Sequence, residues 1–566
     1  MQRIFAAIFV LLFAAGDAAA WGVRYPPSRW LTDDDRRPIA SPNGTGALFA
    51  PREVPSEEAR SVEMLFELTA RVTELPASYL PGGLIDAQNV NDFDEAPDST
   101  WFTNRIGRRS LSAAEIAAGP GLPALSASGP LELFCFGRGA VSAWFAVRDS
   151  KGEDYFVILD DPAMPEMATG AGMITGRALF AAGYNVAPTG LLSLDLKRLE
   201  LTDASTFRDE SGSVRKATGA DLAELLGAFG RGKGRGAARA LVTQKPDGAY
   251  LGPFSFSGKR RNDGNDRIQH QQRRELRGLS LFAAWLDDRL AVDSRTADIF
   301  VPAGEGGLGY VVHYLFGFEG SLGNFETSAA GIDAYVHPSA KLEPVVMGLP
   351  NITLYTKREA RTDKAKPWPF DVTNFDPARW NTASPNVAFS SRVERDGLWA
   401  AFILSKFGDG EIEALVGSAK FGDARLSRHI AEVLRGRRDR LLSYWLTKQS
   451  PLADFDVGRC GDGYRVRFSD VAVLSGLEGA AGSTYLWRLK TLNGKATLVG
   501  PQSTAEDGVV IDGHALSRML TGRLHDLEIS AKRPDEEWPM TPVHLLVRKA
   551  ASGALEIAGI TRRSGR

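Results

Sequence analysis

Four acidic side chains in the middle of the chain are candidates for phosphoryl-transfer chemistry: Glu166, Asp288, Asp293 and Glu319. That reaction needs a strand lysine to hold phosphates, a helix carboxylate to hold the lysine, and a loop acid with a downstream Asn. A second acid must follow a buried strand and carry the metal ion. A divergent phosphotransferase would use Glu166, Asp288 or Asp293, and Glu319, with ATP and Mg²⁺ as cofactors.

The predicted elements follow the order that such an active centre requires: strand, helix, long insertion, helix and loop, strand and loop. They are a β-meander at 131–159, a helix at 166–182, a helix at 273–290, an apolar strand at 309–316 and a turn at 317–323. Residues 397–446 are also predicted to be helical. In that stretch Arg435, Arg437, Arg438 and Arg440 are expected to form a solvated face.

His270, Arg273 and Arg274 open the helix at 273–290. Backbone N–H groups at a helix start, together with cationic side chains, suit an anionic ligand. The competing interpretation, which we favour, is a structural network that joins these residues to Glu275 and nearby acids.

Trp101 and Arg105 are unusual residues for a loop. An exposed Trp would stack on a ligand or a glycan, whereas packing against the β-meander is an equal alternative. With His270, Arg273 and Arg274 they complete the candidate ligand-binding set. No set of metal ligands is assigned.

Asp287, Asp288, Asp293 and Asp298 lie close together in the sequence. Carboxylates suit Ca²⁺, but the spacing does not match a helix–loop–helix calcium site, so a solvated loop is predicted. His313 lies in the apolar strand and is predicted to be a hydrogen-bonded core histidine rather than a catalytic base.

Parts of residues 92–455 resemble a family of uncharacterised secreted bacterial proteins. The motifs that carry the resemblance are 270–279 (HQQRRELRGL), Trp285, 313–315 (HYL), 98–105 (DSTWFTNR), 165–167 (PEM) and 384–389 (SPNVAF). That family in turn looks distantly like lipid kinases and bacterial toxin kinases of atypical protein-kinase-like fold. The resemblance implies a two-lobed, kinase-like central region.

Compared residue by residue with that family, this chain lacks several of the residues that the resemblance implies. It implies a strand lysine where this chain has Ile158, and Asp-Phe-Gly where it has 317–319 (GFE). The loop acids Asp288 and Asp293 do not stand at the positions that the resemblance implies. The residue at the position of the expected Asn cannot bind a metal ion. Because stabilisation of the transferring group is almost wholly electrostatic, an enzyme with these losses would be slow or inactive. Glu319 could hold a metal only if the loop shifted by two residues.

The N-terminus is typical of a cleaved secretory signal, with Arg3, an apolar run at 4–15 and small residues before Trp21. No later segment reaches the about 18 apolar residues of a membrane helix, so a periplasmic or secreted protein without a membrane span is expected. The formal net charge of −2 gives no bulk attraction to nucleic acid. Cys135 and Cys460 are predicted to be separate buried thiols, although an oxidising compartment would permit pairing.

The predicted class is α+β, with a kinase-like two-lobed central region followed by a small all-β C-terminal domain. The expected domains are a signal peptide (1–20), an N-terminal arm with a helix at 56–74 (21–91), a β-meander plus helix (92–226), a mainly helical region (227–454) and a β-sandwich or barrel-like domain (455–566). Five short strands are expected in the last domain, at 464–468, 484–489, 509–511, 527–529 and 543–547.

Three functional hypotheses follow. The favoured one is a catalytically degenerate, kinase-like protein of the cell envelope that binds an unknown protein or small ligand. The second is the metal-dependent phosphotransferase. The third is an envelope scaffold whose C-terminal β domain contacts carbohydrate or protein.

Overall fold

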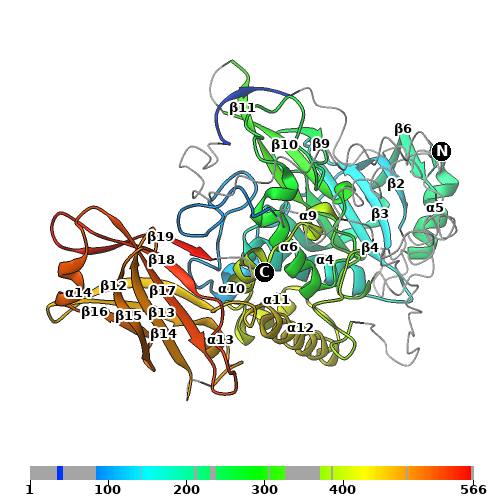
Figure 1. Ribbon diagram of the computed structural model, residues 1–566. Helices are drawn as coiled ribbons and strands as arrows, with labels where there is room; N and C mark the ends of the chain where they lie inside the picture. Colours follow the sequence, from blue (N-terminus) through cyan, green and yellow to red (C-terminus); the bar gives the residue numbers. More distant parts are fainter. Residues whose placement is uncertain are drawn as a thin grey trace, which may run out of the picture.

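The computed structural model shows a mixed helical and sheet protein, which agrees with the expected α+β class (Figure 1). The described residues are 35–42, 85–139, 142–209, 213–229, 237–303, 306–324, 370–383, 386–479 and 482–562. The expected signal segment and the helix at 56–74 lie outside these ranges. Within them, no helix combines the length and apolar character needed to cross a bilayer.

A seven-stranded sheet has the strand order β5-β8-β4-β3-β2-β6-β7. Its strands are β2 (Leu131–Arg138), β3 (Ser142–Arg148), β4 (Asp154–Asp160), β5 (Thr189–Asp195), β6 (Leu199–Arg208), β7 (Val214–Lys216) and β8 (Ala237–Gln244). All neighbours are antiparallel except β2 and β6. The predicted meander is confirmed as β2, β3 and β4. Strand β8 carries the sheet beyond residue 226, where a domain boundary was expected.

The helices that precede the C-terminal strands are α3 (Ala113–Ala118), α4 (Met167–Ala182), α5 (Gly219–Phe229), α6 (Arg274–Leu286), α9 (Val387–Ser390), α10 (Glu394–Leu404), α11 (Asp409–Ser418) and α12 (Ala424–Trp445). The helix predicted at 166–182 is confirmed, and Gly183 caps it with φ of 139°. The helix predicted at 273–290 ends earlier, because Asp287 adopts a left-handed conformation. The helical stretch predicted at 397–446 is divided among α10, α11 and α12.

Both faces of the seven-stranded sheet are covered by apolar side chains. Because side chains alternate along β4, Val157 and Leu159 pack in the core that includes Phe229 of α5. Ile158 packs in the core shared with α4. Helix α4 lies very close to the sheet. A Cβ at Gly172 would be only 2.4 Å from Cδ2 of Leu241, so a larger side chain would push helix and sheet apart.

Helix α6 is buried on all sides and packs on α10 and α12. Glycines permit the close approach of tryptophan rings. A Cβ at Gly278 would be 2.6 Å from the Trp399 ring, and one at Gly397 would be 2.2 Å from the Trp445 ring. The three helices therefore form one tightly packed block.

A four-stranded sheet has the order β1-β11-β10-β9, with β1 (Ile39–Ala40), β9 (Ala249–Gly252), β10 (Thr296–Pro302) and β11 (Leu308–Leu315). Strand β11 confirms the apolar strand predicted at 309–316. The amide of Leu315 donates to the carbonyl of Asn185 at 2.9 Å. The end of β11 therefore lies beside the segment that joins α4 to β5.

The C-terminal strands form a three-stranded sheet, β12-β13-β16, and a five-stranded sheet, β15-β14-β17-β18-β19. These strands are β12 (Leu452–Cys460), β13 (Gly463–Asp470), β14 (Thr484–Thr491), β15 (Thr497–Thr504), β16 (Gly508–Ile511), β17 (Leu524–Lys532), β18 (Val543–Lys549) and β19 (Leu555–Arg562). The five strands predicted here are all confirmed. Both sheets contribute to one apolar core, and two short helices accompany them, α13 (Val471–Leu474) and α14 (Gly513–Arg518). Figure 1 shows these strands, orange to red, beside α10 and α12.

Candidate functional site

A pocket whose empty volume, open solvent included, is about 370 Å³ lies between the seven-stranded sheet and the turn that follows β11. We call it the sheet–turn pocket. Ile158 of β4 and Leu241 of β8 line it from the sheet, and Gly317 and Glu319 line it from the turn. The strand and the turn that the sequence singles out as halves of an active centre therefore meet at one pocket.

The sheet side of this pocket is apolar. Ile158, which stands where the family resemblance implies a lysine, is 2% exposed. It pairs with Leu241 across β4 and β8, and both belong to the core shared with α4. A branched aliphatic side chain at this position offers no charge or hydrogen bond to a phosphate group.

The turn side of the pocket is built around a glycine. Gly317 has φ of 77°, and a Cβ there would be 2.7 Å from Cδ of Arg295. The resemblance implies an Asp at this position. A side chain at residue 317 would require both a left-handed backbone and displacement of Arg295.

Arg295 joins the two acids that remain near the turn. Its guanidinium lies 2.8 Å from the Glu319 carboxylate. Burial raises the pKa of Asp288 to about 6, with the charge of Arg295 opposing this shift and that of Glu319 adding to it. Arg295 therefore offsets the charge of Glu319 through a direct ion pair and acts on Asp288 through its charge.

The other two candidate catalytic acids point elsewhere. The Asp293 carboxylate accepts a hydrogen bond from the amide of Phe256 at 3.0 Å. Glu166 precedes α4 in a left-handed conformation, and its carboxylate accepts from the amide of Gly422 at 2.8 Å. Glu166 does not line the sheet–turn pocket, so the structure brings Ile158 and Glu319 together without it.

The HQQRREL segment forms a buried charge network. His270 Nε2 lies 2.7 Å from Asp266 Oδ2, and Arg273 lies 3.4 Å from the other oxygen of the same carboxylate. Burial alone would raise the pKa of Asp266, but the hydrogen bond from His270 and the two positive charges hold it at about 2. These contacts correspond to the structural network that we favour over an anion site.

Asp94 is the centre of a second part of this network. Its carboxylate lies 2.7 Å from Arg274, 2.7 Å from Arg395 of α10 and 3.0 Å from Arg562 of β19. Burial alone would raise the pKa of Asp94, but the three arginines outweigh it and hold the pKa well below its usual range. Arg274 is also paired with Asp396 at 3.2 Å.

Trp101 is 3% exposed, so the expectation of an exposed stacking residue is wrong. Its ring stacks on His313 with centroids 3.4 Å apart, and Arg273 lies above it at 4.6 Å. Trp101 thus packs on β11 and the start of α6, not on the β-meander. Arg105 donates to the carbonyls of Phe180 at 2.7 Å and of Tyr184, at the C-terminal end of α4.

Two predictions of solvated charges are wrong in part, although Asp293 and Arg440 are exposed as expected. Asp287, Asp288 and Asp298 are buried, and Asp298 accepts a hydrogen bond from His313 Nδ1 at 2.6 Å, which confirms His313 as a bonded core residue. Arg437, predicted on a solvated face, is 4% exposed and donates to the carbonyl of Ala284 at 2.7 Å. Asp298 and His313 face each other on the neighbouring strands β10 and β11, whereas Ala284 is 153 positions from Arg437 in the chain.

Within the described ranges, one group of His, Asp and Glu side chains has ligand atoms close enough to share a metal ion: Asp526, Glu528 and His544, on β17 and β18. Lys490 of β14 lies 2.5 Å from Glu528, and Arg488 also pairs with it. Because these cations already neutralise Glu528, we interpret the group as a cross-strand charge network. Sequence reasoning did not find it. The alternation of Asp526 and Glu528 along one strand was its only local signal.

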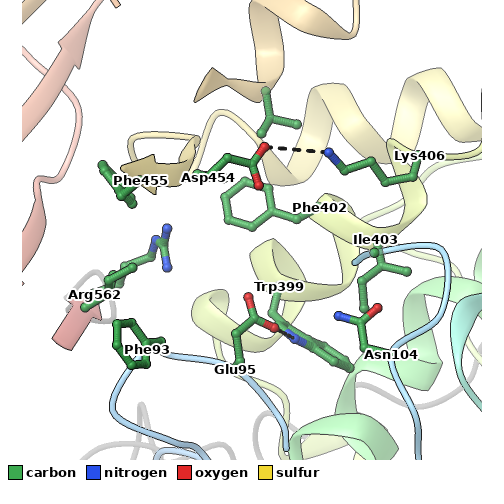
Figure 2. A pocket seen from close by; sticks show the side chains of 14 residues that line it. Phe93, Glu95, Asn104, Trp399, Phe402, Ile403, Lys406, Asp454, Phe455 and Arg562 are labelled. Atoms are coloured by element: carbon green, nitrogen blue, oxygen red, sulfur yellow. Dashed lines mark hydrogen bonds and ion pairs between the residues drawn. The ribbon is translucent and has the colours of Figure 1, made fainter. Parts of the chain in front are cut away.

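A second pocket, with an empty volume of about 550 Å³, lies where the C-terminal strands meet α10 (Figure 2). We call it the junction pocket. Glu95, Trp399, Lys406, Asp454 and Arg562 are among the residues that line it. They come from four separate segments, so no sequence motif marks the site.

Cys135 and Cys460 are both free; Cys135 is buried, whereas Cys460 is partly exposed, so the prediction of two buried thiols is right only for Cys135. Comparisons of this chain with protein-family models, with curated proteins and with solved structures found no match. The two pockets are therefore the structural features that bear on the function of this chain.

Proposed function

We propose that this chain is an exported, kinase-like protein that has lost phosphoryl transfer and acts by binding. The periplasm or the exterior is its proposed location, because the apolar run at 4–15 is followed by small residues suited to signal cleavage. N-terminal sequencing of the protein from the extracytoplasmic fraction should begin near Trp21. An intact Met1 would contradict export by this route.

The observation that carries the proposal is the composition of the sheet–turn pocket. Its sheet wall presents Ile158, and its turn presents Gly317, at the two positions where kinase chemistry requires a cation and a metal-binding acid. A triphosphate with its metal concentrates several charges, and an apolar wall cannot stabilise them. The pocket supports binding of a small, largely apolar group better than turnover of a nucleotide.

The remaining acids support the same conclusion. Glu319 is ion-paired with Arg295 at 2.8 Å. Burial raises the pKa of Asp288 to about 6, which favours its protonated form more than in water. A divalent metal would have to break the ion pair and recruit a partly protonated carboxylate, so metal binding here is disfavoured.

Incubation of the full chain with γ-labelled ATP and Mg²⁺ or Mn²⁺ tests the proposal. We expect no label on the protein, on added acceptor proteins or on released phosphate above the rate in buffer. A thermal-shift titration with the same nucleotide and metals should leave the melting temperature unchanged. Transfer of label that disappears in Glu319→Ala would overturn the proposal in favour of a divergent phosphotransferase.

A matched variant keeps this test specific. Glu413→Ala also removes a glutamate that is paired with an arginine, Arg435 at 2.6 Å, but on the exposed surface of α11. Label transfer that persists equally in both variants would point to a contaminating kinase. That result would not contradict the proposed loss of phosphoryl transfer.

A further inference from the structure

The junction pocket is assembled from four parts of the chain. Glu95 comes from the irregular segment before α3, Trp399 from α10, Asp454 from β12, and Arg562 from β19. In Figure 2 the carboxylate of Asp454 points toward the amino group of Lys406, and the guanidinium of Arg562 lies to the left of the Phe402 ring. Concave sites between packed units, with a few convergent polar groups, are the usual form of small-ligand sites.

The backbone of β12 is distorted where it borders this pocket. The register between β12 and β13 shifts between Ala453 and Asp456, and Asp454 has φ of 52°. Left-handed backbone is uncommon for a residue other than glycine, and such bulges often aim a side chain toward a functional site. Here the distortion presents Asp454 and Phe455 to the pocket.

Two charged groups lie deep in the pocket. Arg562 is buried and held by Asp94, and its Nε has no hydrogen-bond partner among the described residues. The Glu95 carboxylate accepts a hydrogen bond from Trp399 Nε1 at 2.9 Å. Buried polar groups normally have partners, so an unpartnered donor beside a cavity is consistent with an oxygen-bearing ligand.

The charges around the pocket balance. Lys406 and Asp454 lie 3.7 Å apart at the rim, and Glu95 and Arg562 lie further in. Neither an anion nor a cation is favoured by such a set. A wholly apolar ligand is also disfavoured, because it would remove water from these groups without replacing its hydrogen bonds.

Aromatic rings complete the lining. Phe93 is 46% exposed, and Phe402 and Phe455, which are partly buried, also line the pocket, with Arg562 lying over the Phe402 ring. A ligand that fits must therefore offer apolar faces to the rings and, at its edge, groups that both donate and accept hydrogen bonds. A hydroxyl group does both. A pyranose ring has this division, with C–H bonds on its faces and hydroxyls around its edge.

We infer that the junction pocket binds a neutral sugar ring, either a free monosaccharide or the end of a glycan. The site is separate from the sheet–turn pocket. Sugar binding at the junction pocket does not depend on whether the chain transfers phosphate. Nucleotide assays therefore do not test it.

Saturation-transfer difference NMR on the full chain tests the inference with named sugars. The free monosaccharides are D-glucose, D-galactose and N-acetylglucosamine, and the glycan ends are β-1,4-linked oligomers of glucose and of N-acetylglucosamine. At least one sugar should bind saturably. Preference for the oligomers would identify a glycan end as the source, and equal or better binding of a monomer would identify a free sugar.

Two variant pairs test the location. Asp454→Gly removes the carboxylate from a left-handed position that glycine adopts without strain, so stability should be retained while binding weakens about tenfold. Asn262→Gly is its control, because Asn262 is exposed, has φ of 65° and lies outside the pocket. Phe93→Ala should also weaken binding about tenfold, whereas Trp538→Ala, at a side chain that is 73% exposed, should not.

Loss of binding in Asp454→Gly and Phe93→Ala, with both controls unchanged, supports the inference. Binding that is unaffected by the two pocket variants overturns it, because the sugar would then occupy another site. Failure of every sugar to bind at tens of millimolar also overturns it.

Discussion

The guanidinium of Arg562 lies 3.0 Å from the carboxylate of Asp94, although the two residues are 468 positions apart. Both side chains are buried. Asp94 is also paired with Arg274 of α6 and Arg395 of α10. The Asp94 carboxylate thus joins the end of β19 to α6 and α10. The junction pocket lies beside this contact, because Arg562 also lines it.

Arg562→Met should lower the free energy of unfolding by about 3 kcal/mol. Removal of one partner leaves the other charge buried, and Asp94 would keep only two of its three arginines. Chemical denaturation followed by tryptophan fluorescence measures the change. Arg548→Met is the matched control, because its pair with Glu556 is exposed and should contribute about 1 kcal/mol or less. Equal effects of the two variants would show that the buried pair does not hold the C-terminal strands.

Asp288→Asn should stabilise the protein at neutral pH. Burial raises the pKa of Asp288 from 3.8 to about 6, so the folded state binds the proton more tightly than the unfolded state. Stability associated with this group therefore falls as pH rises from about 4 to about 6. Asparagine does not ionise, so the variant does not lose this stability. Its free energy of unfolding should exceed that of the parent chain by about 1–3 kcal/mol at pH 7.5, and the difference should vanish near pH 4.

Denaturation curves of Asp288→Asn and the parent chain at both pH values measure this gain. Asp203→Asn serves as the control, because that carboxylate is fully exposed and lies 3.7 Å from Lys216. It should have little effect at either pH. A gain for Asp288→Asn that is independent of pH would show that the carboxylate is not the cause.

Local patterns in the sequence predicted most of the elements that surround the candidate sites. The helix expected at 166–182 is α4, which ends at Gly183, and α3 starts at a capping box formed by Ser112 and Glu115. These signals work because each depends only on neighbours within a few residues.

Burial of charges could not be predicted in the same way. Arg437 follows other arginines in a helical pattern that is typical of a solvated face. Its acceptors, the carbonyl of Ala284 and the carboxylate of Asp287, are about 150 residues away. The junction pocket was missed for the same reason, because its lining comes from segments that only the tertiary fold brings together.

Gly317→Ala should cost more stability than Gly306→Ala, although both glycines have φ of 77°. At Gly306 a Cβ would meet nothing within 4 Å, so the loss should be about 1 kcal/mol of backbone strain. At Gly317 a Cβ would be 2.7 Å from Arg295, whose movement would break its ion pair with Glu319. Thermal unfolding of both variants measures the difference. Equal losses would show that the turn can accept a side chain at residue 317, where the resemblance implies an acid.

Arg437→Met and Arg435→Met compare a buried arginine with a partly exposed one on the same helix, α12. Arg437 lies 3.2 Å from Asp287 and 3.9 Å from the centre of the Phe375 ring. Burial alone would raise the pKa of Asp287, but Arg437 and Arg289 outweigh it and lower the pKa.

Loss of Arg437 should cost about 3 kcal/mol, because it leaves the Asp287 carboxylate buried with less compensation. Loss of Arg435, whose pair with Glu413 is exposed, should cost about 1 kcal/mol or less. The penalty for Arg437→Met should also shrink in acid, since the uncompensated Asp287 would then be protonated. Denaturation at pH 7.5 and pH 4 measures both effects, and a penalty that does not change with pH would place the cost in lost packing on Phe375 rather than in the buried charge.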